Sequence, residues 1–305
     1  MANLLRTLRS RPDLARNITT FHGSLHPVTQ FVSLPPTLKD WDQQWPTMRR
    51  ERTYTTSIMA SIPSMMNLKF LTLHDFEWLG SMSQDIVCDS IPPPVPLAAI
   101  TLTTLVIECR SFFLTGDLEE NSIQLSLILR SQPFLECLAL RSGNWDLEPL
   151  IVPSDIPLLS HLMAKPREAK VLVRGRPITT LFISGMLIVS DLSVWESIAA
   201  SSAPITTLTL ELAYHDVLGS ALALAAIYTK DVQKLVIQGV IPRELPSLFN
   251  GFPSLHHLHT LCLIVRNPRR EAIESVNGRM SEDQRIGAMA SIRSRCPQFQ
   301  NLEIG

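Results

Sequence analysis

The stretch Pro204-Ile205-Thr206-Thr207-Leu208-Thr209-Leu210 carries an apolar spacing that returns along most of the chain. Its residues Ile205, Leu208 and Leu210 follow the pattern L-x-x-L-x-L. The same spacing recurs at Leu68/Leu71/Leu73, Leu102/Leu105/Ile107, Leu135/Leu138/Leu140, Ile178/Leu181/Ile183, Val232/Leu235/Ile237, Leu258/Leu261/Leu263 and Phe299/Leu302/Ile304, with a weak copy at Leu159/Leu162/Ala164. Such self-similarity indicates one structural unit that the chain uses many times.

The length of the repeat indicates its type. The middle residues of four consecutive copies stand at positions 181, 208, 235 and 261, which gives intervals of 27, 27 and 26 residues. Leucine-rich repeats have periods of about 20–29 residues. Other intervals reach 34, 33 and 41 residues, so the array is irregular and contains insertions. The position three residues after the last apolar residue of each main copy before the final one is never asparagine or cysteine. This argues against the regular extracellular type of leucine-rich repeat.

The pattern has a direct physical meaning. Leu208 and Leu210 alternate with Thr209, so on a strand both leucines face the same side. One unit cannot cover that apolar side alone, so neighbouring units must stack into a continuous core. The sequence therefore predicts an α/β fold, an irregular leucine-rich-repeat solenoid. We expect a curved parallel sheet on its concave face, and helices or loops on its convex face.

Several segments between the expected strands suit helices. They are residues 119–131, 191–199, 218–229 and a helix that follows the capping-box stretch Ser281-Glu282-Asp283-Gln284 and runs to Arg293. The last of these would present Ile286, Met289, Ala290 and Ile292 at helical spacing. Residues 74–97, rich in proline, and the charged residues 165–177 are expected to be insertions.

The expected domain organisation has two parts. A short helix and a strand over residues 18–21 would form a degenerate first unit, so residues 1–60 are expected to be an N-terminal cap with that unit. Residues 61–305 are expected to be the repeat array, as one continuous solenoid.

Composition limits the classes of partner. The formal net charge is −1, so no global field attracts nucleic acid or an anionic membrane. Short basic clusters at residues 49–52, 165–176 and 266–270 are expected to be solvated surface, with a nucleic-acid or phospho-ligand contact as the alternative. The N-terminus lacks the apolar core of a signal peptide, and the longest apolar run, residues 217–228, is too short to span a bilayer. We expect a cytoplasmic or nuclear protein whose five cysteines are free thiols.

Catalytic motifs are not found in this sequence. It contains no G-x-G-x-x-G, G-x-x-x-x-G-K-[ST], G-x-S-x-G or H-E-x-x-H, and glycine is scarce. The densest polar cluster is His256, His257 and His259 around Leu258. Two of these histidines could bind a metal if a turn brought them together, but we interpret them as surface or loop residues. The sequence therefore predicts no enzyme, no cofactor and no metal site.

The strand geometry gives a candidate binding surface. If the alternating leucines point inward, the residues between and beside them point out from the concave sheet. These outward residues are Phe70, Thr72, His74, Val106, Glu108, Ala139, Arg141, Phe182, Ser184, Thr209, Glu211, Val236, Gln238, Cys262 and Ile264. Their central column is largely apolar and includes an aromatic residue, as protein-binding surfaces do. The alternative is that long loops cover this column and make it part of the core.

Two stretches resemble a known family. The opening Leu4-Leu5-Arg6-Thr7-Leu8-Arg9-Ser10-Arg11-Pro12-Asp13-Leu14-Ala15 resembles the segment that joins the F-box to the first repeat in fungal, especially mushroom-type, F-box/leucine-rich-repeat proteins. The stretch Val171-Leu172-Val173-Arg174-Gly175-Arg176-Pro177-Ile178 is similar to an L-V-P-G-R-P segment before a strand in that group, with Arg174 in place of its proline.

The resemblance covers the repeat region only, and the F-box is missing from this sequence. It implies a substrate-recognition lobe of a cullin-type ubiquitin ligase, whose repeats hold the protein to be ubiquitinated. A Skp-type adaptor is implied as a partner only if an F-box exists upstream. The alternative is a free-standing repeat-type inhibitor or regulatory scaffold that is unrelated to ubiquitination.

Overall fold

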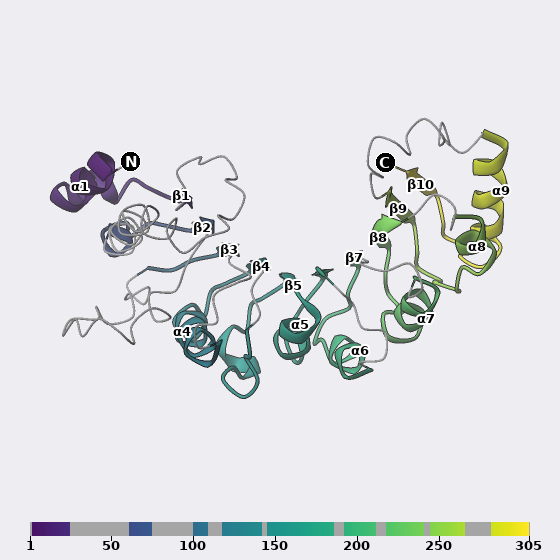
Figure 1. Cartoon of the computed structure of the whole chain (residues 1–305), viewed down its shortest axis with the longest axis horizontal. Helices are drawn as coiled ribbons and strands as arrows, with labels where there is room; N and C mark the ends of the chain where they lie inside the picture. Colours follow the sequence, from purple (N-terminus) through teal and green to yellow (C-terminus); the bar gives the residue numbers. More distant parts are fainter. Residues whose placement is uncertain are drawn as a thin grey trace, which may run out of the picture. The chain divides into compact units, whose positions relative to one another are not determined.

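The structure, a computed structural model, divides into two compact units, Met1–Leu159 and Ser160–Gly305. It describes residues 2–24, 61–74, 100–108, 118–141, 145–185, 192–211, 218–240, 245–265 and 282–304. Each unit is an α/β structure in which parallel strands alternate with helices or irregular segments (Figure 1). The proline-rich residues 75–99, and the basic clusters at residues 49–52 and 266–270, lie outside the described residues.

Within its described residues, the first unit has four parallel strands, ordered as they follow along the chain. Its described elements are α1 (Ala2–Ser10), α2 (Pro12–Ala15), β1 (Thr20–Ser24), the 3-10 helix η1 (Ile62–Ser64), β2 (Phe70–His74), β3 (Thr104–Glu108), α4 (Leu118–Arg130), β4 (Cys137–Arg141) and the 3-10 helix η4 (Pro153–Asp155). The short helix expected at the N-terminus is confirmed as α1.

In the part of the second unit that the structure describes there are six parallel strands, again in chain order. Helices α5, α6 and α7 lie together on one side of its strands (Figure 1). Its described elements are β5 (His161–Ala164), α5 (Pro166–Val173), β6 (Thr180–Ile183), α6 (Leu192–Ala199), β7 (Thr207–Glu211), α7 (Leu218–Tyr228), β8 (Lys234–Val240), α8 (Leu245–Asn250), β9 (Thr260–Val265), α9 (Glu282–Arg293) and β10 (Asn301–Ile304).

The repeated apolar residues form the cores of both units. Every residue of the L-x-x-L-x-L copies, the weak copy included, is buried except Ile304, which is 39% exposed on the last described strand. The middle residues of neighbouring copies are register partners within each unit, as Leu181 is with Leu208 and Leu208 with Leu235. The strand positions inferred from the repeat spacing are therefore confirmed.

A ladder of backbone hydrogen bonds joins each repeat to the next. The Thr179 carbonyl accepts from the N–H groups of Thr206 (2.9 Å) and Thr207 (3.1 Å), directly before β7. The Thr206 carbonyl accepts in the same way from Gln233 (2.8 Å) and Lys234 (3.0 Å). The other such acceptors are the carbonyls of Thr19, Lys69, Thr103, Ser160, Gln233 and His259. Since buried backbone groups need partners, this ladder fixes the register at which the repeats stack.

Threonine side chains add a third donor to several rungs of this ladder. The hydroxyl of Thr206 donates to the Thr179 carbonyl, and that of Thr179 to the Ser160 carbonyl, both at 3.3 Å. Thr103 makes the same contact with the Lys69 carbonyl at 3.3 Å in the first unit. Threonine at the residue before a strand thus supports the stacking where no asparagine is present.

Four predicted helices are confirmed with small shifts of their ends, as α4, α6, α7 and α9. Two expectations are wrong. Residues 165–177 are not a plain charged insertion, because α5 forms there with Pro166 in its first turn and a buried face that includes Ala169 and Leu172. The expected apolar face of α9 is also wrong: of its four residues Ile292 is buried and Met289 half-buried, but Ile286 is 58% exposed and Ala290 is exposed, whereas Ala288 is buried instead.

The first strand also begins later than expected. The predicted strand covered residues 18–21, whereas β1 spans Thr20–Ser24. The reason is the stacking ladder: the Thr19 carbonyl accepts from Lys69 and Phe70, so pairing with β2 begins only after Thr19. Ser281 and the tryptophan-bearing residues 41–48 lie outside the described residues.

A buried arginine closes α5. The Arg176 guanidinium is fully buried and donates to the carbonyls of Val171 (2.9 Å) and Leu172 (3.2 Å), two of the last carbonyls of the helix. A cation at a helix C-terminus also complements the helix dipole. Gly175, with φ of 71°, supplies the left-handed turn between the helix and the arginine. The Arg176 carbonyl accepts in turn from the backbone of Ser202 (2.9 Å) in the next repeat.

Replacing Thr206 with valine tests the threonine rungs. Thr206→Val keeps the side-chain shape but removes one hydrogen bond to the Thr179 carbonyl, so we expect the free energy of unfolding to fall by about 1 kcal/mol. Urea unfolding followed by circular dichroism measures the change. The matched control is Thr209→Val, a half-buried threonine on the outward face of β7, the strand that follows Thr206, for which we expect a change below about 0.5 kcal/mol. Equal effects of the two changes would contradict the role given to Thr206.

Replacing Arg176 with methionine tests the helix closure. Arg176→Met leaves the Val171 and Leu172 carbonyls without their charged donor, and we expect a loss of about 3 kcal/mol in the free energy of unfolding. Arg174→Met is the control, because Arg174 is exposed two residues earlier. Thermal and urea unfolding of the two variants provide the measurement. An Arg176 variant as stable as the Arg174 variant would overturn this interpretation.

Candidate functional site

The face of the second unit's strands opposite its buried leucines presents three parallel rows of side chains. The central row contains one residue from each strand, each paired with its neighbour in the register. Its members, from β5 to β10, are Met163, Phe182, Thr209, Val236, Cys262 and Glu303. Because neighbours in this row are direct register partners, their side chains lie side by side across the strands.

This central row is apolar and partly open to solvent. Met163, Phe182, Val236 and Cys262 are all half-buried, in contrast with the flanking leucines, which are fully buried. Ile264, also on β9, is 39% exposed. Apolar side chains that remain accessible on a sheet face are typical of surfaces that bind another protein.

Charged and polar side chains border the central row on both sides. Thr180, Thr207, Lys234 and Thr260 lie on the side where the strands begin. Glu211 lies where β7 ends, and its carboxylate accepts a hydrogen bond from the Gly185 N–H at 3.1 Å. Gly185 has φ of 83°, a left-handed conformation in which glycine is favoured. An apolar row with polar borders has the organisation of a protein interface, with a core and a rim.

The Cys262 thiol is the nucleophilic side chain within the row. Burial raises its pKa above the ordinary thiol value, and the Glu303 carboxylate beside it adds to the rise, while Lys234 acts in the opposite direction. Since a thiolate is the nucleophilic form, Cys262 is kept protonated at neutral pH. The environment therefore suits a packing side chain and not an activated nucleophile.

The first unit presents a shorter face of the same kind. Val106 and Ala139 are half-buried register partners, and Glu108 and Arg141 follow them along β3 and β4. Phe70 is 46% exposed, in agreement with its expected place on the surface. Thr72 is also expected there, but it is only 9% exposed. Alternation along a strand fixes where a side chain points and not how far solvent reaches it. The side chain of His74 lies outside the described residues.

Sequence reasoning missed two members of the central row. Met163 belongs to the weak repeat copy and Glu303 to the last copy, and neither was carried into the expected surface. Applying the same spacing to these two copies would have found both residues. Of the predicted residues in the second unit, Phe182, Thr209, Val236 and Cys262 are brought into one row, and Ser184, Glu211, Gln238 and Ile264 follow it along the same strands.

The histidine cluster shows no metal-binding arrangement in the described structure. His256 and His257 are exposed, and the His259 ring contacts the Gln298 side-chain oxygen at 2.9 Å. No group of three or more histidine, cysteine, aspartate or glutamate side chains within the described ranges could hold a metal ion.

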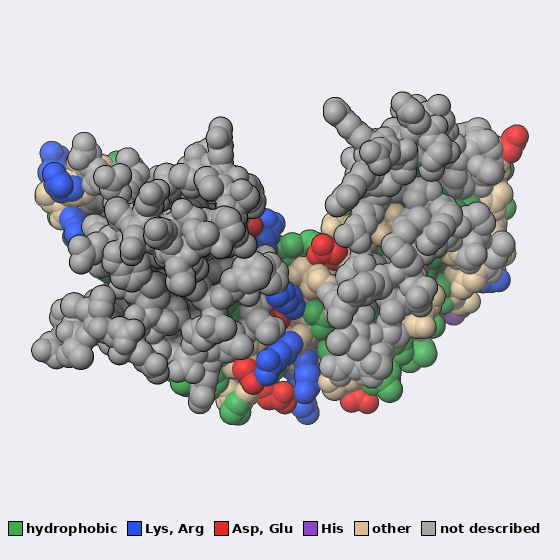
Figure 2. Space-filling view, viewed as in Figure 1, with side chains coloured by type: hydrophobic (Ala, Val, Ile, Leu, Met, Phe, Trp, Pro, Cys, Tyr) green, Lys and Arg blue, Asp and Glu red, His purple; other side chains and the backbone are tan. Residues whose placement is uncertain are grey.

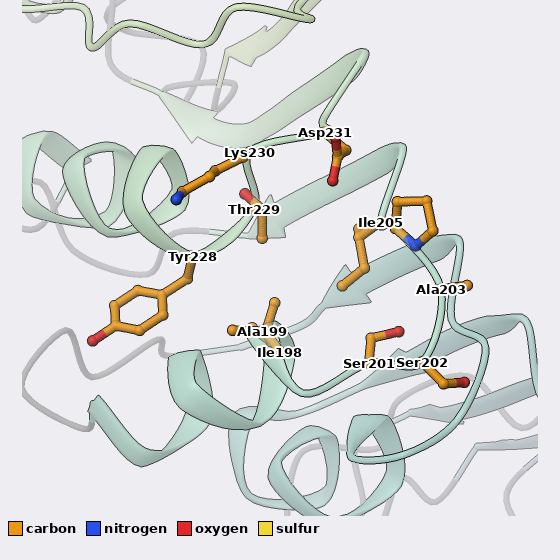
Figure 3. A pocket seen from close by; sticks show the side chains of 11 residues that line it. Ile198, Ala199, Ser201, Ser202, Ala203, Ile205, Tyr228, Thr229, Lys230 and Asp231 are labelled. Carbon is orange, nitrogen blue, oxygen red and sulfur yellow. The ribbon is translucent and has the colours of Figure 1, made fainter.

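A hollow of about 380 Å³ lies between the segments that lead into β7 and β8 (Figure 3). Its lining includes Ser201, Tyr228, Lys230 and Asp231. The Ser201 hydroxyl already donates to the Arg176 carbonyl at 2.9 Å, and the charged groups of Lys230 and Asp231 point in different directions (Figure 3). A ligand site needs polar groups that converge on one point, so this hollow is the weaker candidate.

Apolar side chains are also visible over α6 and α7 in the space-filling view (Figure 2). Leu192 on α6 is 47% exposed and Ile227 on α7 is 58% exposed. Scattered exposed apolar residues are normal on protein surfaces, so these two residues serve below as controls.

The reactivity of Cys262 tests the geometry of the row. Glu303→Gln removes the carboxylate that raises the pKa of the thiol, so the pKa should fall and the thiolate fraction at pH 8 should rise. We expect faster alkylation of Cys262 by iodoacetamide, measured by peptide mass spectrometry. Lys234→Met should have the opposite effect, because Lys234 lowers that pKa. Unchanged rates in both variants would contradict the placement of these three side chains.

In the part of the chain that the structure describes, no helix is long and apolar enough to cross a membrane. The described cysteines, Cys137, Cys262 and Cys296, are free. Neither the protein-family models nor the curated proteins compared with this chain gave a match. The candidate surface is therefore assigned from its geometry.

Proposed function

We propose that this protein is an irregular leucine-rich-repeat solenoid that binds a protein partner on the exposed face of β5 to β10. The observation that carries the proposal is the half-buried apolar row that includes Met163, Phe182 and Val236, with polar residues along both borders. Burying accessible apolar side chains supplies the main favourable term in protein association. The proposed role is recognition, with no reaction carried out by the chain itself.

The repeat architecture supports this role. Stacking buries the inward side chains, such as Leu208, and engages backbone groups in hydrogen bonds between repeats, such as those accepted by the Thr179 carbonyl. The outward side chains of this face lie outside that core and those backbone hydrogen bonds, apart from Glu211, whose carboxylate accepts from the Gly185 N–H, which leaves their identities open to serve recognition. Repeat proteins commonly bind partners on such extended surfaces.

The resemblance to F-box/leucine-rich-repeat proteins suggests a more specific role. In that role, the surface would hold a protein that a cullin-type ubiquitin ligase modifies. The two stretches that carry the resemblance correspond to α1 with α2 and to the segment around α5 and Arg176. In this structure both stretches form helices or the turn that follows a helix, which is no evidence of a ligase. Support for ligase function therefore comes from the resemblance alone. A free-standing inhibitor or scaffold would use the same surface.

A comparative pull-down tests the binding surface. The full chain and the double variant Phe182→Asp, Val236→Asp are used to capture proteins from a lysate of the source organism, with quantitative mass spectrometry as the readout. Each aspartate places a charge in the apolar row, so we expect at least tenfold less of the specific partner with this variant. Circular dichroism checks that both forms are folded.

The control carries the same number of aspartates on the helical side. Leu192→Asp, Ile227→Asp replaces two exposed apolar residues of α6 and α7, and should recover the partner as the unmodified chain does. Recovery of the same proteins with all three forms would rule out the sheet face as the binding surface. Recovery of a Skp-type adaptor with the full chain would support the ligase role.

A further inference from the structure

The central row of the second unit has a regular pitch. Its six residues, Met163, Phe182, Thr209, Val236, Cys262 and Glu303, are consecutive register partners on β5 to β10. Neighbouring strands in a sheet lie about 4.8 Å apart, so the row extends about 24 Å across the strands. A partner segment that follows this row must present one side chain about every 4.8 Å.

An α-helix fits this pitch better than other chain conformations. Same-side residues of a helix recur at about 5.4 Å per turn, which differs from the row by about 0.6 Å per step. In an extended strand they recur at about 6.7 Å, a mismatch of roughly 2 Å per step. In polyproline II the repeat is about 9.3 Å. Over five steps the mismatch is about 3 Å for a helix and about 10 Å for a strand.

The position of the row also disfavours an added strand. A peptide that joins a sheet as a strand needs the free backbone groups of a sheet edge. The row instead crosses the face of the sheet, where the backbone groups of β6 to β9 are engaged with neighbouring strands. Contacts on this face must therefore be made by side chains, as when an amphipathic helix binds in a groove.

The charges around the row indicate the orientation and the flanks of such a helix. Glu303 is exposed at the β10 end, and a carboxylate is favourable near the positive N-terminus of a helix. Lys234 and Glu211, both exposed, lie on opposite borders of the row. A complementary helix carries an acidic residue on the flank near Lys234 and a basic residue on the flank near Glu211.

We propose that the partner segment is an amphipathic α-helix of about four turns, roughly 16 residues, whose apolar stripe lies along this row with its N-terminus at β10. The inference rests on the proposed function, because it names the kind of segment that the binding surface takes. The apolar residues of the helix contact Met163, Phe182, Val236 and Cys262. The partner helix carries a small residue opposite Thr209, the polar residue that stands between Phe182 and Val236 in the row.

Photo-crosslinking of the captured partner tests the conformation. A p-benzoylphenylalanine is placed at position 209 in one variant and at position 303 in another, and the crosslinked partner residues are mapped by mass spectrometry. The two positions are three strand spacings apart, about 14 Å, which corresponds to about 10 residues of helix but only about 4 residues of extended chain. We expect a separation of about 10 residues, with the position 303 crosslink nearer the partner's N-terminus.

A synthetic peptide covering the crosslinked segment provides the second measurement. A proline at its centre should weaken binding to the full chain at least tenfold by fluorescence anisotropy, because proline breaks a helix. A position 227 crosslinker, on α7, is the control and should not label this segment. A separation of about 4 residues, crosslinks in unrelated segments, reversed order, or a proline peptide that binds equally well would overturn the inference.

The outcomes separate this inference from the proposed function. If the Phe182→Asp, Val236→Asp variant retains every partner, the sheet face is not the binding surface and both proposals fail. If that variant loses the partner but the crosslinks show an extended or discontinuous segment, only the helical assignment fails.

Discussion

The structure depends on one repeated interaction, in which the carbonyl of the residue before most of the described strands accepts two N–H groups from the next repeat. At Thr179 the two donors are the backbone groups of Thr206 and Thr207, and the Thr206 carbonyl continues the series. Each rung fixes where the following strand begins relative to its neighbour. Because a shift of one residue would turn every side chain to the opposite face, this fixed starting point is what keeps the leucines inside and the central row outside.

The ladder also explains how an irregular repeat can form a regular sheet. Intervals between middle residues range from 19 to 41 residues, the weak copy included, and the connecting segments include helices of different lengths such as α4 and α8. A connection can grow without disturbing the strands, since only its last residues must reach the preceding carbonyl. Insertions in such segments cost little, because loop-closure entropy rises slowly with length. The connecting segments can therefore vary in length, whereas the residue at which each strand begins is fixed by its hydrogen bonds to the preceding repeat.

Sequence patterns predicted the strands better than the parts that depend on tertiary contacts. The L-x-x-L-x-L spacing located the strands because burial of alternate residues leaves a direct mark on the sequence, even in the weak copy at Leu162. The helix α5 was missed because its charged residues read as an exposed insertion, and the buried role of Arg176 depends on carbonyls that become available only once that helix forms. In α9 the buried residues are Ala288 and Ile292, four apart, whereas Ile286, as hydrophobic as Ile292 and more hydrophobic than Ala288, is exposed. Hydrophobicity alone could not indicate which of them faces the core.

Alternation along each strand separates the residues that form the core from the residues on the proposed binding face. Leu208 and Leu210 are held by the core, so a polar residue at either position would cost several kcal/mol in a tightly packed interior. Thr209 between them is half-buried on the opposite face of the strand, so a change there is expected to cost less. Every strand offers one such position in the central row, and the register places these positions about 4.8 Å apart whatever their identity. The fold therefore fixes the spacing of the residues in this row, while their chemistry, apolar at Phe182 and Val236 and charged at Glu303, differs from strand to strand and would decide which partner the proposed surface accepts.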